Sequence, residues 1–142
     1  MSQENVEIVR AMWEPFKGLD TTAIDWDTAI RVIGQAISSE VELRWSATDP
    51  EGARVYRGRD GVAQAFREWV EPFREYHSEP LDYIGVGDSV VVPTRQWGIG
   101  RASGAPVEIE NTHVYEFRGN QIARVDEYDT LEEALEAARL RE

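Results

Sequence analysis

The stretch NTHVYEFRGNQIARVDEYD, residues 111–129, has the pattern of two strands around a tight turn. Gly119 and Asn120 lie between two segments that alternate apolar and polar residues, which is typical of a β-hairpin. If they form the centre of the turn, Arg118 pairs with Gln121, and counting outward gives the register. That register predicts a shared face for eight residues: Asn111, His113, Tyr115, Phe117, Ile122, Arg124, Asp126 and Tyr128.

The predicted face combines aromatic and polar side chains. Its large apolar residues must be covered, because exposing each would cost roughly 1.5 to 3 kcal/mol. The polar groups would then be buried as well, so they either bond with one another or surround a cavity that holds water or a ligand. In this register His113 stands opposite Asp126, within hydrogen-bonding reach, and Asn111 stands opposite Tyr128. Arg124 and Tyr128 either complete the network, reach the rim or bind a ligand.

The His113–Asp126 pair has two interpretations. A carboxylate beside an imidazole fixes its tautomer and favours its protonation, which suits general acid–base chemistry. A buried pair whose members satisfy each other, without any catalytic role, is also common. Both interpretations stay open at this point.

Helices are predicted at both ends of the chain and at two places between. Residues 2–17 carry apolar side chains at helical spacing, and a second helix is expected over about 24–37. A third helix follows Asp60, and Pro72 is expected to end it because proline lacks the amide hydrogen. The last helix lies in TLEEALEAARL, residues 130–140.

Strands fill most of the remaining chain. Residues 40–46, EVELRWS, alternate as a strand, residues 48–61 are expected to be loop, and residues 79–129 form strand after strand. A four-residue connection at RASG would direct Thr94 and Gln96 inward. Helices that precede and follow an antiparallel sheet indicate an α+β fold, and residues 1–142 fit one domain.

Composition excludes several classes of partner and cofactor. The chain of 142 residues has 15 basic and 27 acidic residues, a net charge of −12, which repels nucleic-acid phosphates. It has no cysteine, and its two histidines form no helical zinc motif, so we expect no metal. No segment approaches the ~20 apolar residues that span a bilayer, so we expect a soluble cytoplasmic protein without membrane contact.

Three stretches resemble the SnoaL-like proteins of the NTF2-like superfamily: SQENVEIVRAMWEPF, VYRGRDGVAQAFREW and THVYEFRGNQIARVDEY. The resemblance implies a cone, in which a strongly curved antiparallel sheet wraps around N-terminal and central helices, followed by a C-terminal helix. It also implies a pocket at one end and a homodimer through the outer sheet face, for which the expected patch is Val114, Ala123 and Val125. Trp13, Phe16, Phe66 and Trp69 would form the helix-lined wall of the pocket.

The resemblance implies several functions, since this fold hosts many. Polyketide cyclases of the family use a histidine and an acidic residue on the last two strands for proton abstraction next to a carbonyl, which His113 and Asp126 match. Asp126 would be the base, and a compact apolar or aromatic substrate would bind against Tyr115 and the helical wall, with Asn111 or Tyr128 bonding its carbonyl. No cofactor is required. The rival is a non-catalytic ligand-binding or dimerisation module; an epoxide hydrolase using Arg124 and Asp126 ranks lower, because no further aspartate is clearly placed.

Overall fold

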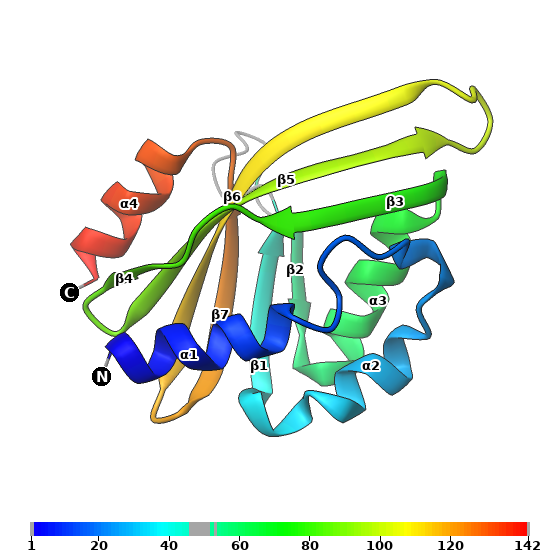
Figure 1. Ribbon diagram of the computed structural model, residues 1–142. Coiled ribbons are helices and arrows are strands. Elements are labelled where there is room, and N and C mark those ends of the chain that lie inside the picture. Colours follow the sequence, from blue (N-terminus) through cyan, green and yellow to red (C-terminus); the bar gives the residue numbers. More distant parts are fainter. Residues whose placement is uncertain (1, 46–51, 53, 142) are drawn as a thin grey trace.

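A computed structural model describes residues 2–45, 52 and 54–141 and shows an α+β fold built on a curved sheet (Figure 1). The sheet has the strand order β2-β1-β7-β6-β5-β3, with the short β4 paired to β5. Its strands are antiparallel except where β1 runs parallel to β7. The strands are β1 Ile37–Trp45, β2 Arg54–Arg57, β3 Phe73–Pro80, β4 Ile84–Val86, β5 Ser89–Gly100, β6 Pro106–Arg118 and β7 Gln121–Tyr128.

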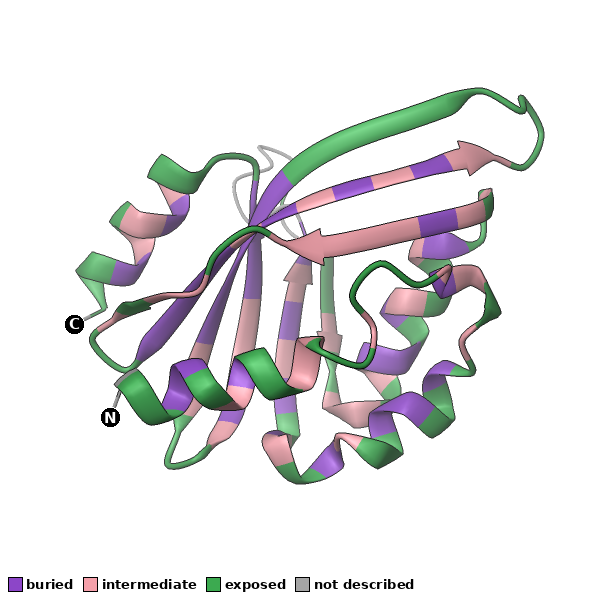
Figure 2. Cartoon of the chain, viewed as in Figure 1, coloured by how far each residue is buried: buried purple, intermediate pink, exposed green. Residues whose placement is uncertain are grey.

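Helices cover both faces of the sheet. On the inner face, α1 Ser2–Trp13, α2 Trp26–Val32 and α3 Gly58–Val70 enclose the main core with residues of β1, β5, β6 and β7. On the outer face, α4 Leu131–Leu140 packs through Ala134 and Ala138 onto Val91, Val114 and Tyr128. The two cores appear in Figure 2 as buried stripes on the helices and along the middle of the sheet. The predicted α+β cone with its C-terminal helix is therefore confirmed.

The β6–β7 hairpin contains a bulge that the sequence count missed. The turn is as predicted, since Arg118 pairs with Gln121 and Phe117 with Ile122. The next pair is Glu116 with Arg124, so Ala123 is an extra residue on β7. A bulge bends its strand and increases the local twist, as a strongly curved sheet requires. Beyond it, every β7 side chain faces opposite to the prediction.

The expected dimer patch does not form on the outer face. Val114 is fully buried there under α4, which already covers it within one chain. Val125 lies beyond the bulge and lines the inner cavity instead. The patch as predicted was wrong for these two residues, because one is covered by α4 and the other points inward. A homodimer itself stays a prediction.

Smaller differences concern the ends of elements. α1 and α2 are shorter than expected, and α3 begins at Gly58, so Asp60 lies in its first turn rather than capping it. Arg54–Arg57, expected as loop, forms β2 on the edge of the sheet. Thr94 and Gln96 point inward as expected and are buried. Among the described residues, no helix is long and apolar enough to cross a membrane.

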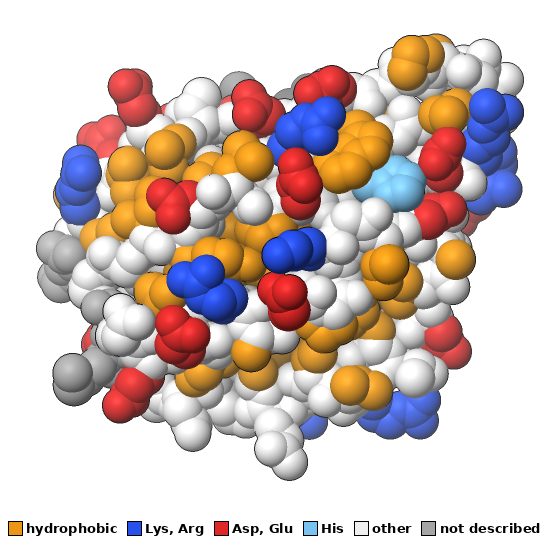
Figure 3. All heavy atoms as spheres, in the orientation of Figure 1, with side chains coloured by type: hydrophobic (Ala, Val, Ile, Leu, Met, Phe, Trp, Pro, Cys, Tyr) orange, Lys and Arg blue, Asp and Glu red, His pale blue; other side chains and the backbone are white. Residues whose placement is uncertain are grey.

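The charges on the outside are of both signs despite the acidic excess. In the view of Figure 3, acidic and basic side chains are interspersed, with hydrophobic side chains between them. Arg95, for example, pairs with Glu108 at 3.0 Å and with Glu79 at 3.5 Å. Exposed pairs of this kind contribute little to stability, so the burial described above holds the fold together.

Gly98 provides the close approach between β5 and β3. A Cβ at this position would lie 2.6 Å from the carbonyl oxygen of Glu75 and 2.7 Å from the Tyr76 ring. We predict that Gly98→Ala lowers the free energy of unfolding by about 1–3 kcal/mol through overpacking. Urea unfolding of the variant and of wild type measures this difference in the free energy of unfolding. Gly34→Ala is the control, since its nearest contact would be the Arg59 side chain at 3.9 Å; equal losses for both variants would contradict the prediction.

Candidate active site

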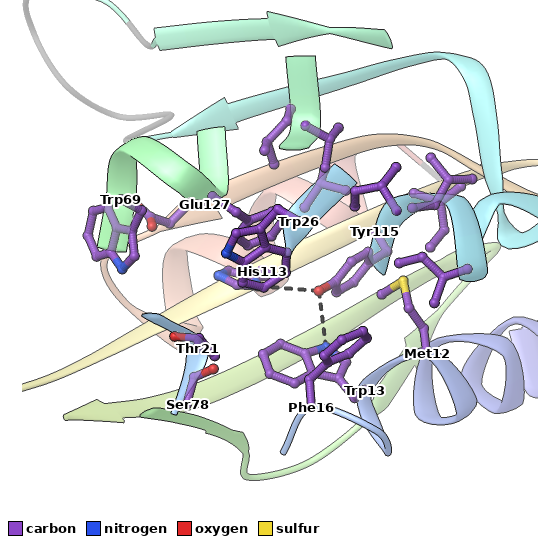
Figure 4. A pocket seen from close by; sticks show the side chains of 18 of the residues that line it. Met12, Trp13, Phe16, Thr21, Trp26, Trp69, Ser78, His113, Tyr115 and Glu127 are labelled. Atoms are coloured by element: carbon purple, nitrogen blue, oxygen red, sulfur yellow. Dashed lines mark hydrogen bonds between the residues drawn. The ribbon is translucent and has the colours of Figure 1, made fainter. Parts of the chain in front are cut away.

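A cavity of about 120 Å³ lies between the three inner helices and the concave face of the sheet (Figure 4). Most of its wall is apolar or aromatic, and the helices supply much of it. The predicted wall residues all line it, and α2 and β1 add two more tryptophans. The aromatic lining consists of Trp13, Phe16, Trp26, Trp45, Phe66, Trp69, Tyr76 and Tyr115.

His113 brings a polar group into this wall. It lies on β6 with 5% of its surface exposed, and its ring is 6.1 Å from those of Trp13 and Trp45. Its Nδ1 is 3.3 Å from the Tyr115 hydroxyl, whereas its Nε2 is buried and has no hydrogen-bond partner in the described part of the chain. Burial lowers the pKa of His113 to about 4, so the imidazole is neutral at pH 7.

Glu127, rather than Asp126, stands opposite His113 in the β6–β7 ladder. It is buried and lines the same cavity. Directly opposed residues have Cβ atoms about 4.5–5.5 Å apart, so the imidazole and this carboxyl group occupy one region of the wall. Because of the bulge at Ala123, Glu127 faces the cavity in the place predicted for Asp126.

A chain of hydrogen bonds leads to the Glu127 carboxylate. The Tyr76 hydroxyl donates to Gln96 Oε1 at 2.6 Å, Gln96 Nε2 donates to Asn111 Oδ1 at 2.8 Å, and Asn111 Nδ2 donates to Glu127 Oε2 at 3.0 Å. Thr94 donates to the same Asn111 oxygen. Every donor in this series of hydrogen bonds points toward the carboxylate, so the network stabilises negative charge on Glu127. Burial, with the nearby Glu127 charge, raises the pKa of Tyr76 to about 12, which keeps this first donor protonated.

Asp126 lies on the outer face, and its predicted pairing with His113 was wrong. It is fully buried beneath α4 and accepts hydrogen bonds from Arg124 Nε at 2.9 and 3.1 Å. Arg141 Nη2 lies 3.0 Å from it. The Arg124–Asp126 combination of epoxide hydrolases is therefore present as a bonded pair, but it cannot reach a ligand in the inner cavity.

The other predicted site residues divide between the two faces. Tyr115 lines the cavity, and its hydroxyl accepts a hydrogen bond from Trp13 Nε1 at 3.1 Å. Asn111 faces inward but supports Glu127 behind the wall instead of opposing Tyr128. Tyr128 and Arg124 face outward, where Tyr128 accepts a hydrogen bond from Arg141 at 3.3 Å and Arg124 also pairs with Glu116 at 3.5 Å. Because the bulge turns both β7 residues away, neither can bind a ligand in the cavity.

The sequence carried a sign of the bulge. Ile122 and Val125 are both apolar and are three residues apart, which breaks strict alternation. Both line the cavity in the structure, and that is possible only with an inserted residue between them. The same shift brings Glu127 inward, so this spacing could have identified the missed acidic residue.

A second hollow lies on the other side of the sheet, beside α4 and the β4–β5 turn. Its volume is about 360 Å³, and its lining includes Glu116 and Arg141. These two already form an ion pair at 3.2 Å. The smaller inner cavity is therefore the better candidate, because it contains a buried polar atom without a partner. The described residues contain no cluster of histidine and acidic residues that could hold a metal ion.

Comparisons with known proteins identify a family from the sequence and a shared fold from solved structures. Residues 31–125 match the model of the SnoaL-like domain. A protein described as a SnoaL-like polyketide cyclase from Jannaschia sp. CCS1 superposes with a TM-score of 0.71 at 16% identity, covering 97% of this chain and 93% of that one. An NTF2-like protein of unknown function from Burkholderia pseudomallei gives 0.66 at 17%, covering 94% and 95%.

TerC, co-crystallised with polyporic acid, gives a TM-score of 0.67 at 18% identity and covers 94% of this chain and 98% of that one. At these identities the solved structures show a common fold. No curated protein matches the sequence significantly.

The buried neutral histidine predicts a specific acid sensitivity. Between pH 6.5 and about 4 the unfolded chain binds a proton at His113 and the folded chain does not. This contribution to stability is complete above pH 6.5 and falls by about 1.4 kcal/mol per pH unit below it. Wild type should therefore lose stability more steeply over this range than His113→Phe, as measured by urea unfolding at several pH values.

His77 gives a control of opposite sign. Burial lowers its pKa, but its contacts with Glu75 and the Gly18 carbonyl outweigh that effect and raise it. Its contribution is present below pH 6.5 and is lost as pH rises through the raised pKa. His77→Asn should therefore be destabilised most at acid pH.

The His113 prediction is contradicted if the free energy of unfolding falls with pH in parallel for wild type and His113→Phe. That result would show that His113 is not buried in its neutral form.

Proposed function

The chain belongs to the SnoaL-like family, and on that premise we propose that it is a small-molecule enzyme that abstracts a proton next to a carbonyl group. Glu127 is the general base, and His113 contacts the carbonyl oxygen. No cofactor takes part in this step. The substrate is a compact and largely apolar ring compound held in the inner cavity.

The observation that carries the proposal is the pairing of two different polar groups in one apolar wall. His113 Nε2 is buried without a partner, although an unmet buried polar group costs about 1–3 kcal/mol. Glu127, directly across the ladder, lines the same cavity and is supported by Asn111. A ligand between them would satisfy the imidazole and place its C–H bonds near a carboxylate.

The proposed step needs only these groups. A Glu127 carboxylate oxygen takes the proton from the carbon next to the carbonyl, and the C–H electron pair forms a C=C bond. The carbonyl oxygen gains the negative charge, which the hydrogen bond from His113 stabilises. The protonated Glu127 then returns a proton, or a deuteron taken up from D2O, to the same carbon, which is exchange, or to a conjugated carbon, which is isomerisation. If the enolate carbon instead attacks a second carbonyl group of the substrate, a C–C bond closes a ring and Glu127 protonates the new alkoxide.

The cavity limits the size of the ligand. Its volume of about 120 Å³ is of the same order as apolar cavities of about 150 Å³ that hold one benzene ring. Tryptophan and phenylalanine faces suit a flat or ring-shaped molecule. The description of one similar structure as a polyketide cyclase, and the crystallisation of another with polyporic acid, support a small-molecule ligand.

A non-catalytic ligand-binding protein is the second candidate, and one observation favours it. The pKa of His113, lowered to about 4 by burial, makes this residue unable to shuttle protons at pH 7. Turnover would then depend on Glu127 alone. Mass spectrometry of ligand released from freshly purified protein, followed by incubation of that ligand with fresh protein, separates binding without change from conversion.

We predict that the protein accelerates hydrogen–deuterium exchange next to the carbonyl of cyclohexanone in D2O, as measured by mass spectrometry. Glu127→Gln should lower the exchange rate at least about 100-fold, since a positioned base contributes roughly 10²–10⁴-fold. The loss of a buried ion-pair partner should lower the stability of Asp126→Asn, whose exchange rate per folded molecule should stay close to that of wild type.

The two acidic variants decide between the adjacent residues. If Asp126→Asn abolishes exchange while Glu127→Gln retains it, the assignment of the base is wrong. If wild type gives no exchange above buffer but releases an unchanged ligand, the binding function replaces the enzymatic one.

A further inference from the structure

Two side chains that line the cavity each have a buried ring nitrogen without a partner among the described residues: His113 at Nε2 and Trp26 at Nε1. Their residues are 5% and 8% exposed. We infer that Trp13 and Tyr115 hold His113 as its Nε2-protonated tautomer, and that His113 and Trp26 together present two N–H donors to an uncharged ligand with a carbonyl-type oxygen. This inference deepens the proposed function, on which its ligand class rests.

The tautomer follows from the partners of the Tyr115 hydroxyl. Trp13 Nε1 can only donate, so its bond of 3.1 Å makes the Tyr115 oxygen an acceptor. The other contact of that oxygen is His113 Nδ1 at 3.3 Å. If Nδ1 carried the proton, two N–H groups would point at one oxygen and the hydroxyl proton would have no acceptor in this set. In the arrangement that fits both contacts, Trp13 Nε1 donates to the Tyr115 oxygen and the Tyr115 hydroxyl donates to His113 Nδ1.

The protonation states support that direction. Burial raises the pKa of Tyr115, so its hydroxyl keeps its proton and remains a donor. Burial lowers the pKa of His113, so the ring carries one proton at neutral pH. With Nδ1 accepting from Tyr115, that proton belongs on Nε2. Trp13, which comes from α1, is therefore a positioning residue that acts through Tyr115.

Trp26 supplies the second donor from a different element. It lies on α2, and its ring stacks on Phe66 at 4.5 Å and on Phe16 at 6.0 Å. Contacts with these two aromatic rings restrict the indole, so the direction of its N–H group is restricted too. Indole nitrogen donates and never accepts, so only an acceptor group can satisfy it.

The donors and the surrounding charge define the ligand class. An ammonium ion would leave both N–H groups unsatisfied, and a carboxylate would meet the Glu127 carboxylate in the same wall. Either ion would also lose its hydration against a mainly apolar lining. An uncharged ketone, ester or similar carbonyl compound of about one ring satisfies the donors without these penalties.

The tautomer is tested by NMR on the full-length protein with 15N-labelled histidine at pH 7. The two ring nitrogens of His113 should show the Nε2-protonated pattern. Tyr115→Phe, and more weakly Trp13→Phe, should shift the ring toward a mixture of tautomers while the fold is retained by circular dichroism. An Nδ1-protonated His113 in wild type, or the same tautomer in Tyr115→Phe as in wild type, would overturn the positioning role of Trp13 and Tyr115.

The ligand class is tested by titration with three probes of similar shape: cyclohexanone, methylenecyclohexane and cyclohexylammonium. Cyclohexanone should move the His113 Nε2–H and Trp26 Nε1–H resonances and bind most tightly. Trp26→Phe should weaken cyclohexanone about three- to tenfold more than it weakens methylenecyclohexane, because only the ketone loses a hydrogen bond. Equal affinity for all three probes, tighter binding of the ammonium, or absence of cyclohexanone binding would overturn the inference.

These readouts separate the inference from the proposed function. Binding of cyclohexanone with both N–H shifts but without deuterium exchange would support the donor pair and reject the enzyme. Exchange that depends on Glu127 but leaves both N–H resonances in place would support the enzyme and reject the donor pair.

Discussion

The inserted residue Ala123 on β7 is the constraint on which the candidate site depends. Side chains of a strand alternate between faces, so one extra residue reverses every side chain beyond it. Before the bulge, Ile122 pairs with Phe117 on the inner face; after it, Val125 and Glu127 face inward and Arg124 and Asp126 face outward. The bend that lets the sheet curve around the helices therefore also decides which of two consecutive acidic residues reaches the cavity.

The surroundings of the two acidic residues fit their different faces. Asp126 is fully buried, and arginine side chains from β7 and the end of α4 compensate its charge. Glu127 accepts a hydrogen bond from Asn111 on the inner side, at the end of a series of neutral side chains that leads back to Tyr76. Ion pairs therefore hold Asp126 on the outer face as a structural group, whereas Glu127 is held by an amide donor in the wall of the cavity.

The fold was accessible from the sequence because its signals were local and mutually consistent. Apolar spacing predicted helices at both ends of the chain, and Gly119-Asn120 correctly gave the turn and the inward direction of His113 and Tyr115. Counting residues from the turn gave the wrong acidic partner for His113, because that count assumes strict alternation, and the spacing of Ile122 and Val125 was the sign in the sequence that β7 departs from it. Arg54–Arg57 was missed for a different reason: this short edge strand is mostly exposed, so burial imposes no alternation on its residues.

Burial separates the roles of the two polar groups in the cavity. Withdrawal from water lowers the pKa of His113 to about 4, which removes its charge change from the physiological range and leaves it a fixed hydrogen-bonding group. The same withdrawal strengthens any hydrogen bond that it makes to a developing negative charge. In the proposed reaction, proton transfer then falls to Glu127, which accepts a hydrogen bond from Asn111 and not from the histidine. An aromatic cavity with one group for the proton and another for the oxygen needs no charge relay between them, and this is why the loss of the predicted His113–Asp126 pair does not remove the proposed chemistry.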